Sequence, residues 1–224
     1  MTAWSYSSIK TFDQCPKKYY HLKVAKDVKD VPGEAAIYGT MVHEAAEHYI
    51  KDGTPIPEKF AYIRPTVERL AAIDGDKHCE LRLGVSKTDT GYEPTTFFGK
   101  NVWWRGIVDL VIIDGAKAYM VDYKTGKNAR YADPKQLDLM AGALFVHYPD
   151  LEVIKSALVY VVSNELIPKT HTRDKMDMYL SVFADELDRL EGAELSGVWN
   201  PKSGPLCGWC PVVECEHYKP PRRR

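Results

Sequence analysis

Two β-rich runs joined by an Asp114-Gly115 pair constrain the fold of this chain most strongly. Residues 102–113 and 117–124 are dominated by apolar, β-branched and aromatic residues, a pattern typical of strands. Asp-Gly is a common turn between the two strands of a tight hairpin. We therefore expect an antiparallel hairpin over these two ranges. An alternating segment over 79–85 predicts a strand before it, which makes a three-strand meander with a loop over 90–100.

Helices are expected before this meander. Ser7 or Ser8 precedes a pattern typical of a capped amphipathic helix. A second helix is predicted over about residues 36–50, where apolar residues recur at helical spacing. A third is predicted over 58–73, after a loop over 53–57.

Elements of both kinds are expected after the meander. A helix over 133–147 would have Asp133 as its cap and Pro134 in its first turn. Residues 154–163 form an almost continuous apolar run, which is typical of a strand buried on both faces. A short strand near 168–172 and a long helix near 174–193 would follow.

This order predicts an α/β fold with a mixed central β-sheet flanked by helices. We expect a single domain over residues 1–224. Within it we distinguish an N-terminal helical part over about 1–75, a core over about 76–195 and a C-terminal segment over about 196–218 that carries three cysteines.

Composition and charge exclude few classes of protein. Apolar residues make up 45% of the chain and charged residues 27%, as in an ordinary globular protein. No run is long and apolar enough to cross a bilayer, and the first residues lack the pattern of a signal peptide. We therefore expect no membrane association and a cytoplasmic location, in a prokaryotic or phage-infected cell. The formal charge of −1 does not exclude a nucleic-acid enzyme, because metal ions bring positive charge of their own.

Three charged residues on the predicted hairpin indicate a metal site. Asp109 interrupts an otherwise apolar strand, and Asp122 and Lys124 lie two apart on the next, so that they share a face. Buried charges need partners, and Mg²⁺ or Mn²⁺ could bind both carboxylates together with a phosphate. Lys124 could then orient a water or neutralise charge on the phosphate. The alternative is an Asp–Lys salt bridge on a solvated hairpin, because D-x-K triplets are common.

These motifs resemble those of the PD-(D/E)XK nuclease superfamily, in particular its RecB-like and Cas4-like exonuclease branch. The resemblance covers most of the chain. It is carried by an opening motif, a helical histidine motif, a central acid motif and a D/E-x-K motif: Ser5-Tyr6-Ser7-Ser8-Ile9 with Phe12, Cys15 and Pro16; Gly39-Thr40-Met41-Val42-His43-Glu44; Gly106-Ile107-Val108-Asp109; and Asp122-Tyr123-Lys124-Thr125-Gly126.

The resemblance implies a restriction-endonuclease-like core and a set of site residues. His43 would be a metal ligand with Asp109 and Asp122, although a lone helical histidine is more often structural. Tyr123 and Glu80 are counted among the metal-binding residues as well. Gln136 falls at the family's Q-x-x-x-Y motif near the DNA backbone, with Met140 at the tyrosine position. A zinc protease is excluded, because H-E-x-x-H needs its second histidine four residues on and His48 is five residues from His43.

The cysteines predict a second, structural metal site. The chain has five, an odd number that argues against a disulfide framework. Cys207, Cys210 and Cys215 offer three thiolates and Cys15 a fourth, a set that suits zinc or an iron–sulfur cluster. The resemblance implies a [4Fe-4S] cluster that joins the N- and C-terminal segments, with Zn²⁺ as the alternative. Cys79 is expected to be a buried small residue.

Cations next to aromatic residues predict a nucleic-acid surface. Lys127, Arg130 and Tyr131 follow the D-x-K strand, and Arg105 follows two tryptophans, Trp103 and Trp104. The alternative is that the tryptophans are core residues and the cations a solvated loop.

We therefore expect a metal-dependent DNA nuclease, by resemblance an exonuclease acting on ends or single strands in recombination, repair or phage DNA processing. A recombination, helicase or single-strand-binding protein would be its partner. Three alternatives stay open: a catalytically inactive DNA-binding module of the same fold, a Cas4-like nuclease of CRISPR adaptation, and a zinc-stapled protein-interaction domain.

Overall fold

The computed structural model describes residues 3–220 and divides into two compact units. The sheet unit comprises Gly33–Val182. The terminal unit combines the described parts of Met1–Pro32 and Phe183–Arg224, the two ends of the chain. The single-domain organisation stays a prediction.

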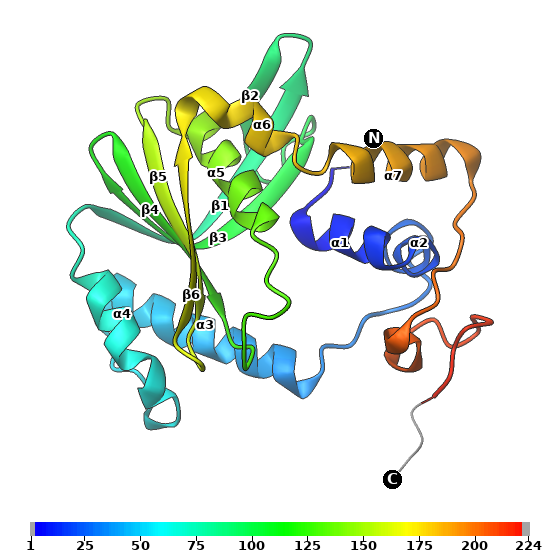
Figure 1. The fold of residues 1–224 in the computed structure, drawn as a ribbon, viewed down its shortest axis with the longest axis horizontal. Helices are drawn as coiled ribbons and strands as arrows, with labels where there is room; N and C mark the ends of the chain where they lie inside the picture. Colours follow the sequence, from blue (N-terminus) through cyan, green and yellow to red (C-terminus); the bar gives the residue numbers. More distant parts are fainter. Residues whose placement is uncertain (1–2, 221–224) are drawn as a thin grey trace. The chain divides into compact units, whose positions relative to one another are not determined.

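A six-stranded sheet forms the centre of the sheet unit (Figure 1), in the order β2-β1-β3-β4-β5-β6. The strands are β1 (Asp76–Thr88), β2 (Gly91–Thr95), β3 (Trp104–Asp114), β4 (Lys117–Lys124), β5 (Val153–Tyr160) and β6 (Glu165–Thr172). The pair β4–β5 is parallel and the other pairs are antiparallel. The mixed sheet flanked by helices confirms the predicted fold class.

The strands depart from prediction mainly at the edges of the sheet. The range 90–100, expected to be a loop, contains β2, which pairs with β1 at the edge of the sheet. The expected neighbours β1, β3 and β4 are present, but β2 lies outside them instead of between β1 and β3. β2 contains Pro94, which cannot donate to a ladder; an edge strand tolerates this because one side of it is unpaired. At the other edge, β6 begins at Glu165 instead of near 168, and its neighbour β5 ends at Tyr160 instead of 163.

Two helices cover one face of the sheet (Figure 1): α3 (Glu34–Asp52) and α4 (Arg64–Ala71), which follows a 3₁₀ turn at Glu58–Ile63. α3 ends at Gly53, whose φ of 75° is the left-handed conformation that commonly closes a helix. The apolar residues of these helices and of the sheet form one core cluster: Val42, Ala45, Ala46, Phe60, Ile63 and Val67 with Leu110, Ile112, Val121 and Tyr123. α3 is therefore fixed against β3 and β4 by hydrophobic burial.

The opposite face carries α5 (Lys135–His147), which connects the parallel strands β4 and β5. Every residue of α5 from Gln136 to Phe145 is buried. The N-cap is Pro134, although the Asp133 carboxylate does accept the Lys135 N–H at 3.2 Å. A Cβ at Gly142 would come within 2.8 Å of Leu180 Cγ, so glycine permits the next helix, α6 (Met176–Leu180), to pack closely.

A buried polar network ties α5 to β6. Asp138 accepts hydrogen bonds from Lys169 Nζ at 2.6 Å and from His171 Nε2 at 3.0 Å. His171 is fully buried, and its Nδ1 lies 3.4 Å from Ser156 Oγ. Burial alone would raise the pKa of Asp138, but the hydrogen bonds from His171 and Lys169 outweigh it and lower the pKa. Asp138 is therefore a buried anion with two satisfied partners.

The predicted long helix over 174–193 is wrong. The structure has two helices there, α6 and α7 (Ala184–Ser196), and the unit boundary falls between them, at Phe183. The Ser181 N–H donates back to the Asp177 and Met178 carbonyls, which closes α6. No glycine or proline lies at this break, so the usual sequence signals of a helix end are missing.

The terminal unit contains α1 (Tyr6–Gln14), α2 (Pro16–Tyr19), a π turn at Tyr20–Val24, α7 and a 3₁₀ turn at Pro205–Trp209. Ser5 caps α1, not Ser7 or Ser8. Its Oγ accepts the Ser8 N–H at 3.2 Å and its N–H donates to Ser8 Oγ at 2.9 Å, a reciprocal capping box. Among the described residues, no helix is long and apolar enough to span a membrane.

Candidate metal centre

The ladder of the sheet opens around Asp109. Asp109 and Glu80 face each other between the pairs Cys79–Leu110 and Leu81–Val108. Glu80 has a φ of 49°, a left-handed conformation that non-glycine residues adopt rarely and mostly at functional sites. β3 lies between β1 and β4, and it pairs with β4 only from Leu110 onward. Before that point, the Tyr123 N–H donates to Asp109 Oδ2 at 2.7 Å. A carboxylate thus replaces a backbone acceptor here.

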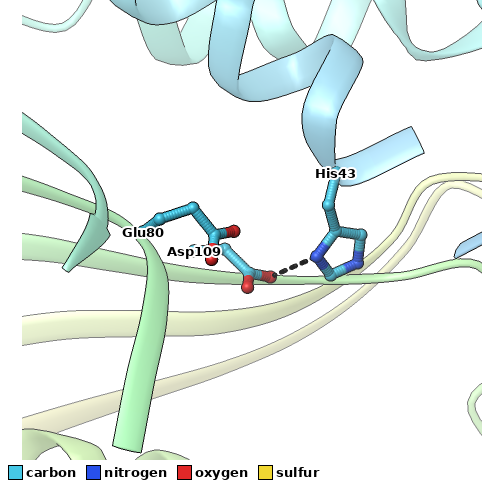
Figure 2. A group of neighbouring side chains, drawn as sticks. All are labelled: His43, Glu80 and Asp109. Carbon is cyan, nitrogen blue, oxygen red and sulfur yellow. Dashed lines mark ion pairs between the residues drawn. The ribbon is translucent and has the colours of Figure 1, made fainter. Parts of the chain in front are cut away.

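α3 brings His43 to the same place. Figure 2 shows its imidazole directed toward the carboxylates of Asp109 and Glu80. His43 Nδ1 lies 3.3 Å from Asp109 Oδ2, and its ring packs edge-to-face on Tyr123 at 5.8 Å between centroids. One ligand atom from each of His43, Glu80 and Asp109 lies within 4.8 Å of the other two.

The electrostatics of this group favour a bound cation. Burial lowers the pKa of His43, but the hydrogen bond and charge of Asp109, with the charges of Asp122 and Glu80, raise it overall. Burial and then the charges of Asp109 and Glu47 raise the pKa of Glu80. Carboxylates held together in this way repel each other, and a divalent cation offsets the repulsion. Two carboxylates and an imidazole are donors that suit Mn²⁺, and the carboxylates suit Mg²⁺.

A second cluster adjoins the first and includes Asp122, Lys124 and Gln136. Asp122 Oδ2 lies 2.5 Å from Lys124 Nζ, and Asp122 Oδ1 accepts from Gln136 Nε2 at 2.6 Å. Lys124 Nζ donates to Gln136 Oε1 at 3.0 Å, which closes the triangle. Asp122 is only 5% exposed; burial raises its pKa to about 6, while the neighbouring Lys124 opposes the shift. The triangle fixes the ammonium group of Lys124 at the edge of the metal group.

The predicted metal ligands are thus divided between two neighbouring groups: His43, Glu80 and Asp109 in one, and Asp122 in the other. Asp122 is not among the three residues whose ligand atoms converge, whereas Glu80 is. Tyr123 connects the two groups, because its N–H binds Asp109 and its ring contacts His43. Met140, at the position of the family tyrosine, is 4% exposed, with its Sδ 4.0 Å from Gln136 Nε2.

The predicted nucleic-acid contacts lie in two places. Lys127 and Tyr131 line one cavity with His43 and Lys124. Arg130 is exposed, with its guanidinium 5.5 Å from the Tyr131 ring centroid. Arg105 lies elsewhere, on β3, four residues before Asp109. Trp104 is fully buried, so for this residue the alternative of a core position holds.

A second cleft next to His43 contains residues of the quoted motifs and two residues, Glu47 and Arg82, that the sequence did not single out. Besides the metal group it is lined by Thr40, Glu44, Glu47, Arg82 and Ile107. Helical spacing offered a signal for Glu47, which lies one turn after His43 and so shares its face. Alternation along a strand offered one for Arg82, which lies two residues after Glu80.

The four cysteines of the predicted cluster line a single cavity of about 340 Å³ in the terminal unit, together with apolar residues such as Leu206 and Val212. Backbone N–H groups donate to two of the sulfurs, Lys202 to Cys15 at 3.4 Å and Gly204 to Cys207 at 3.3 Å. Such bonds are typical of thiolate ligands. An ion pair of 2.7 Å between Lys17 and Glu216 also joins the two segments. The donor set and the space fit an iron–sulfur cluster.

The family model of the PD-(D/E)XK nuclease superfamily matches residues 3–215. A solved structure titled "Putative exonuclease", from Eubacterium rectale, has a TM-score of 0.52 at 12% identity and covers 96% of this chain and 86% of its own. Another, titled "SSO0001", has a TM-score of 0.49 at 12% identity and covers 98% and 88%. A search of the curated proteins finds no significant match.

Proposed function

Because the chain belongs to the PD-(D/E)XK nuclease superfamily, we propose that it hydrolyses phosphodiester bonds of DNA, at ends or in single strands, with a divalent metal ion held by His43, Glu80 and Asp109. The convergence of these three side chains, next to a lysine held by a buried aspartate, is the observation that carries this proposal. Asp122 and Tyr123 complete the proposed metal-binding set.

The ion supplies Lewis acidity: it polarises the phosphoryl group and lowers the pKa of a water. The protein supplies positions. The Tyr123 N–H holds Asp109, whose carboxylate in turn orients His43. The left-handed backbone of Glu80 is strained, and its carboxylate lies next to His43 and Asp109. Such strain is often found at binding sites.

Lys124 is the proposed group that orients the attacking water or stabilises charge on the phosphate. Its ammonium is restrained by Asp122 and Gln136, so that little reorganisation is needed when charge develops. Asp122 is buried and accepts from Gln136, which keeps it aligned on Lys124. Gln136 is therefore a positioning residue in this proposal.

DNA would reach this centre along the two cavities that meet at His43. Lys127 and Tyr131 offer phosphate and base contacts in the cavity that they share with His43, and Arg130 lies beside Tyr131. Arg105 offers a further cation on β3, four residues before Asp109. Nothing on these surfaces resembles a base-reading element, so we propose little sequence specificity.

The finer assignment is to the RecB-like and Cas4-like exonuclease branch, with a [4Fe-4S] cluster on Cys15, Cys207, Cys210 and Cys215. The cavity that these thiols line has room for the cluster, and the choice of the cluster over a single zinc ion rests on the family resemblance. The cluster would be structural, and would hold the first and last segments of the chain together.

Digestion of 5′- and 3′-labelled single strands with Mn²⁺ tests the proposal. We expect the wild type to release short products from an end, and Asp109→Asn to cut about 100-fold more slowly or worse, since a metal ligand is lost. Asp188→Asn, an exposed change on α7, is the matched control and should cut normally. A wild type that binds DNA without cutting it would favour the inactive module, and a fully active Asp109→Asn would remove the metal centre from the reaction.

A further inference from the structure

Two phenylalanines after β2 carry a group of cations outside the catalytic residues. Phe98 is 75% exposed, and its ring packs edge-to-face on Phe97 at 4.9 Å between centroids. The Arg105 guanidinium lies 5.5 Å from the Phe97 centroid and 5.9 Å from that of Phe98. The Arg82 guanidinium lies 5.9 Å from the Phe97 centroid. We call these four residues the Phe97–Phe98 platform.

The platform continues the cleft of the metal centre. Arg82 pairs with Ile107, and both line the cleft that contains His43 and Asp109. Gly84 pairs with Arg105, one step further along the same face of the two strands. Arg105 is four residues from Asp109, which corresponds to about 13 Å along a strand.

Gly84 lets the chain place the platform over this face. A Cβ at Gly84 would lie 2.7 Å from the Thr96 carbonyl oxygen and 2.9 Å from that of Thr95. The backbone just before Phe97 therefore lies directly against β1, which is possible only because residue 84 has no side chain.

We propose that the platform binds single-stranded DNA: a base stacks on Phe98 while Arg82 and Arg105 contact phosphates between that base and the metal centre. Exposed aromatic faces among cations are the usual means of binding single strands, because any base offers a face for stacking. A base inside a duplex is already stacked on both neighbours and offers no free face. This inference rests on the proposed function and adds to it the form of the substrate.

The spacing along β3 indicates how much of the DNA strand would lie between the platform and the metal centre. At a rise of about 3.4 Å per nucleotide, the 13 Å from Arg105 to Asp109 corresponds to about four nucleotides, and to fewer if the strand is stretched. A small diester such as bis(4-nitrophenyl) phosphate, which cannot span this distance, should reach the metal centre without touching Phe98.

Phe98→Leu and Phe98→Trp form the test pair, because leucine keeps an apolar side chain without an aromatic face and tryptophan restores one. Binding of a fluorescent oligothymidine to the full-length protein is measured with Ca²⁺ in place of Mn²⁺, and cleavage is measured with Mn²⁺. We expect Phe98→Leu to weaken binding about 5- to 100-fold, the range for loss of one stacked base, and Phe98→Trp to bind like the wild type. Hydrolysis of bis(4-nitrophenyl) phosphate should be equal in all three.

Several results would overturn the platform. Equal binding by Phe98→Leu and wild type would do so while leaving the nuclease function intact, since the wild type would still cut. Equal losses on a closed circular duplex, which has no terminal base pair, and on the single strand would show that stacking is not involved. Equal losses on the small diester would show that the change disturbs the metal centre. A wild type that neither binds nor cuts DNA would remove the proposed function and the platform together.

Discussion

Replacing Gln136 with methionine isolates the hydrogen bonds that hold Lys124 and Asp122. Methionine has nearly the same length and volume, so the change leaves no sizeable cavity. Lys124 has a side-chain exposure of 31%, so water can replace the bond it loses. Asp122 is 5% exposed, so the 2.6 Å bond to its Oδ1 goes unreplaced. A bond to a charged group is worth about 1.5–3 kcal/mol, and we expect Gln136→Met to lose that much stability.

In thermal unfolding this loss corresponds to a Tm lower by about 3–12 °C for a chain of this size. We also expect kcat/KM on single-stranded DNA with Mn²⁺ to fall about 10- to 100-fold, as for other residues that orient a catalytic group. Gln14→Met is the matched control, because Gln14 is exposed on α1, in the other unit, and its Oε1 accepts a hydrogen bond from Lys18 Nζ at 3.2 Å; it also lines the cysteine cavity, so the iron content of this variant is measured as well. If Gln136→Met kept the wild-type Tm and kcat/KM, the triangle would have no role in positioning Lys124.

Three further predictions concern other parts of the chain. The hydrogen bonds that lower the pKa of Asp138 stabilise the fold at neutral pH, and this stabilisation is lost as pH falls through that pKa. In urea titrations, the difference in free energy of unfolding between wild type and Asp138→Asn should therefore be constant above about pH 5 and shrink below pH 3.8, the usual pKa of an aspartate. A difference that stays constant down to pH 2 would refute the pairing. Cys210→Ser, purified without oxygen, should lose the visible absorbance and the iron of the wild type and unfold at a lower temperature; a colourless, zinc-loaded wild type would contradict the cluster. Gly84→Ala should cost about 1–3 kcal/mol in denaturant unfolding, because its Cβ meets two carbonyl oxygens; unchanged stability would show that the Phe97 segment gives way easily.

The central hairpin could be predicted from local sequence patterns. Strand alternation and the Asp114-Gly115 turn depend only on neighbouring residues, and the structure has β3 and β4 joined at that turn. The same alternation predicts Asp122 and Lys124 on one face, and in the structure Asp122 Oδ2 lies 2.5 Å from Lys124 Nζ. The predicted roles of Asp122 and Lys124 follow from the need of buried charges for partners, and that of His43 from motif resemblance; all three stay predictions.

Features that depend on tertiary contacts were not predictable in the same way. The left-handed Glu80 lies within a strand, and nothing in its neighbours signals that conformation. Gly91 and Pro94 are turn residues and predict a loop, whereas pairing with β1 makes this segment the strand β2. The break between α6 and α7 has no glycine or proline, so periodicity ran across it. In each case the conformation depends on residues remote in sequence, or the local residues carry none of the usual signals for it.

Anomalous diffraction from crystals of the wild type grown with Mn²⁺ tests the metal centre most directly. We predict a manganese peak within bonding distance of His43 and of the carboxylates of Asp109 and Glu80. A map with no peak there at saturating Mn²⁺, or with those three side chains turned away from a common point, would contradict the account.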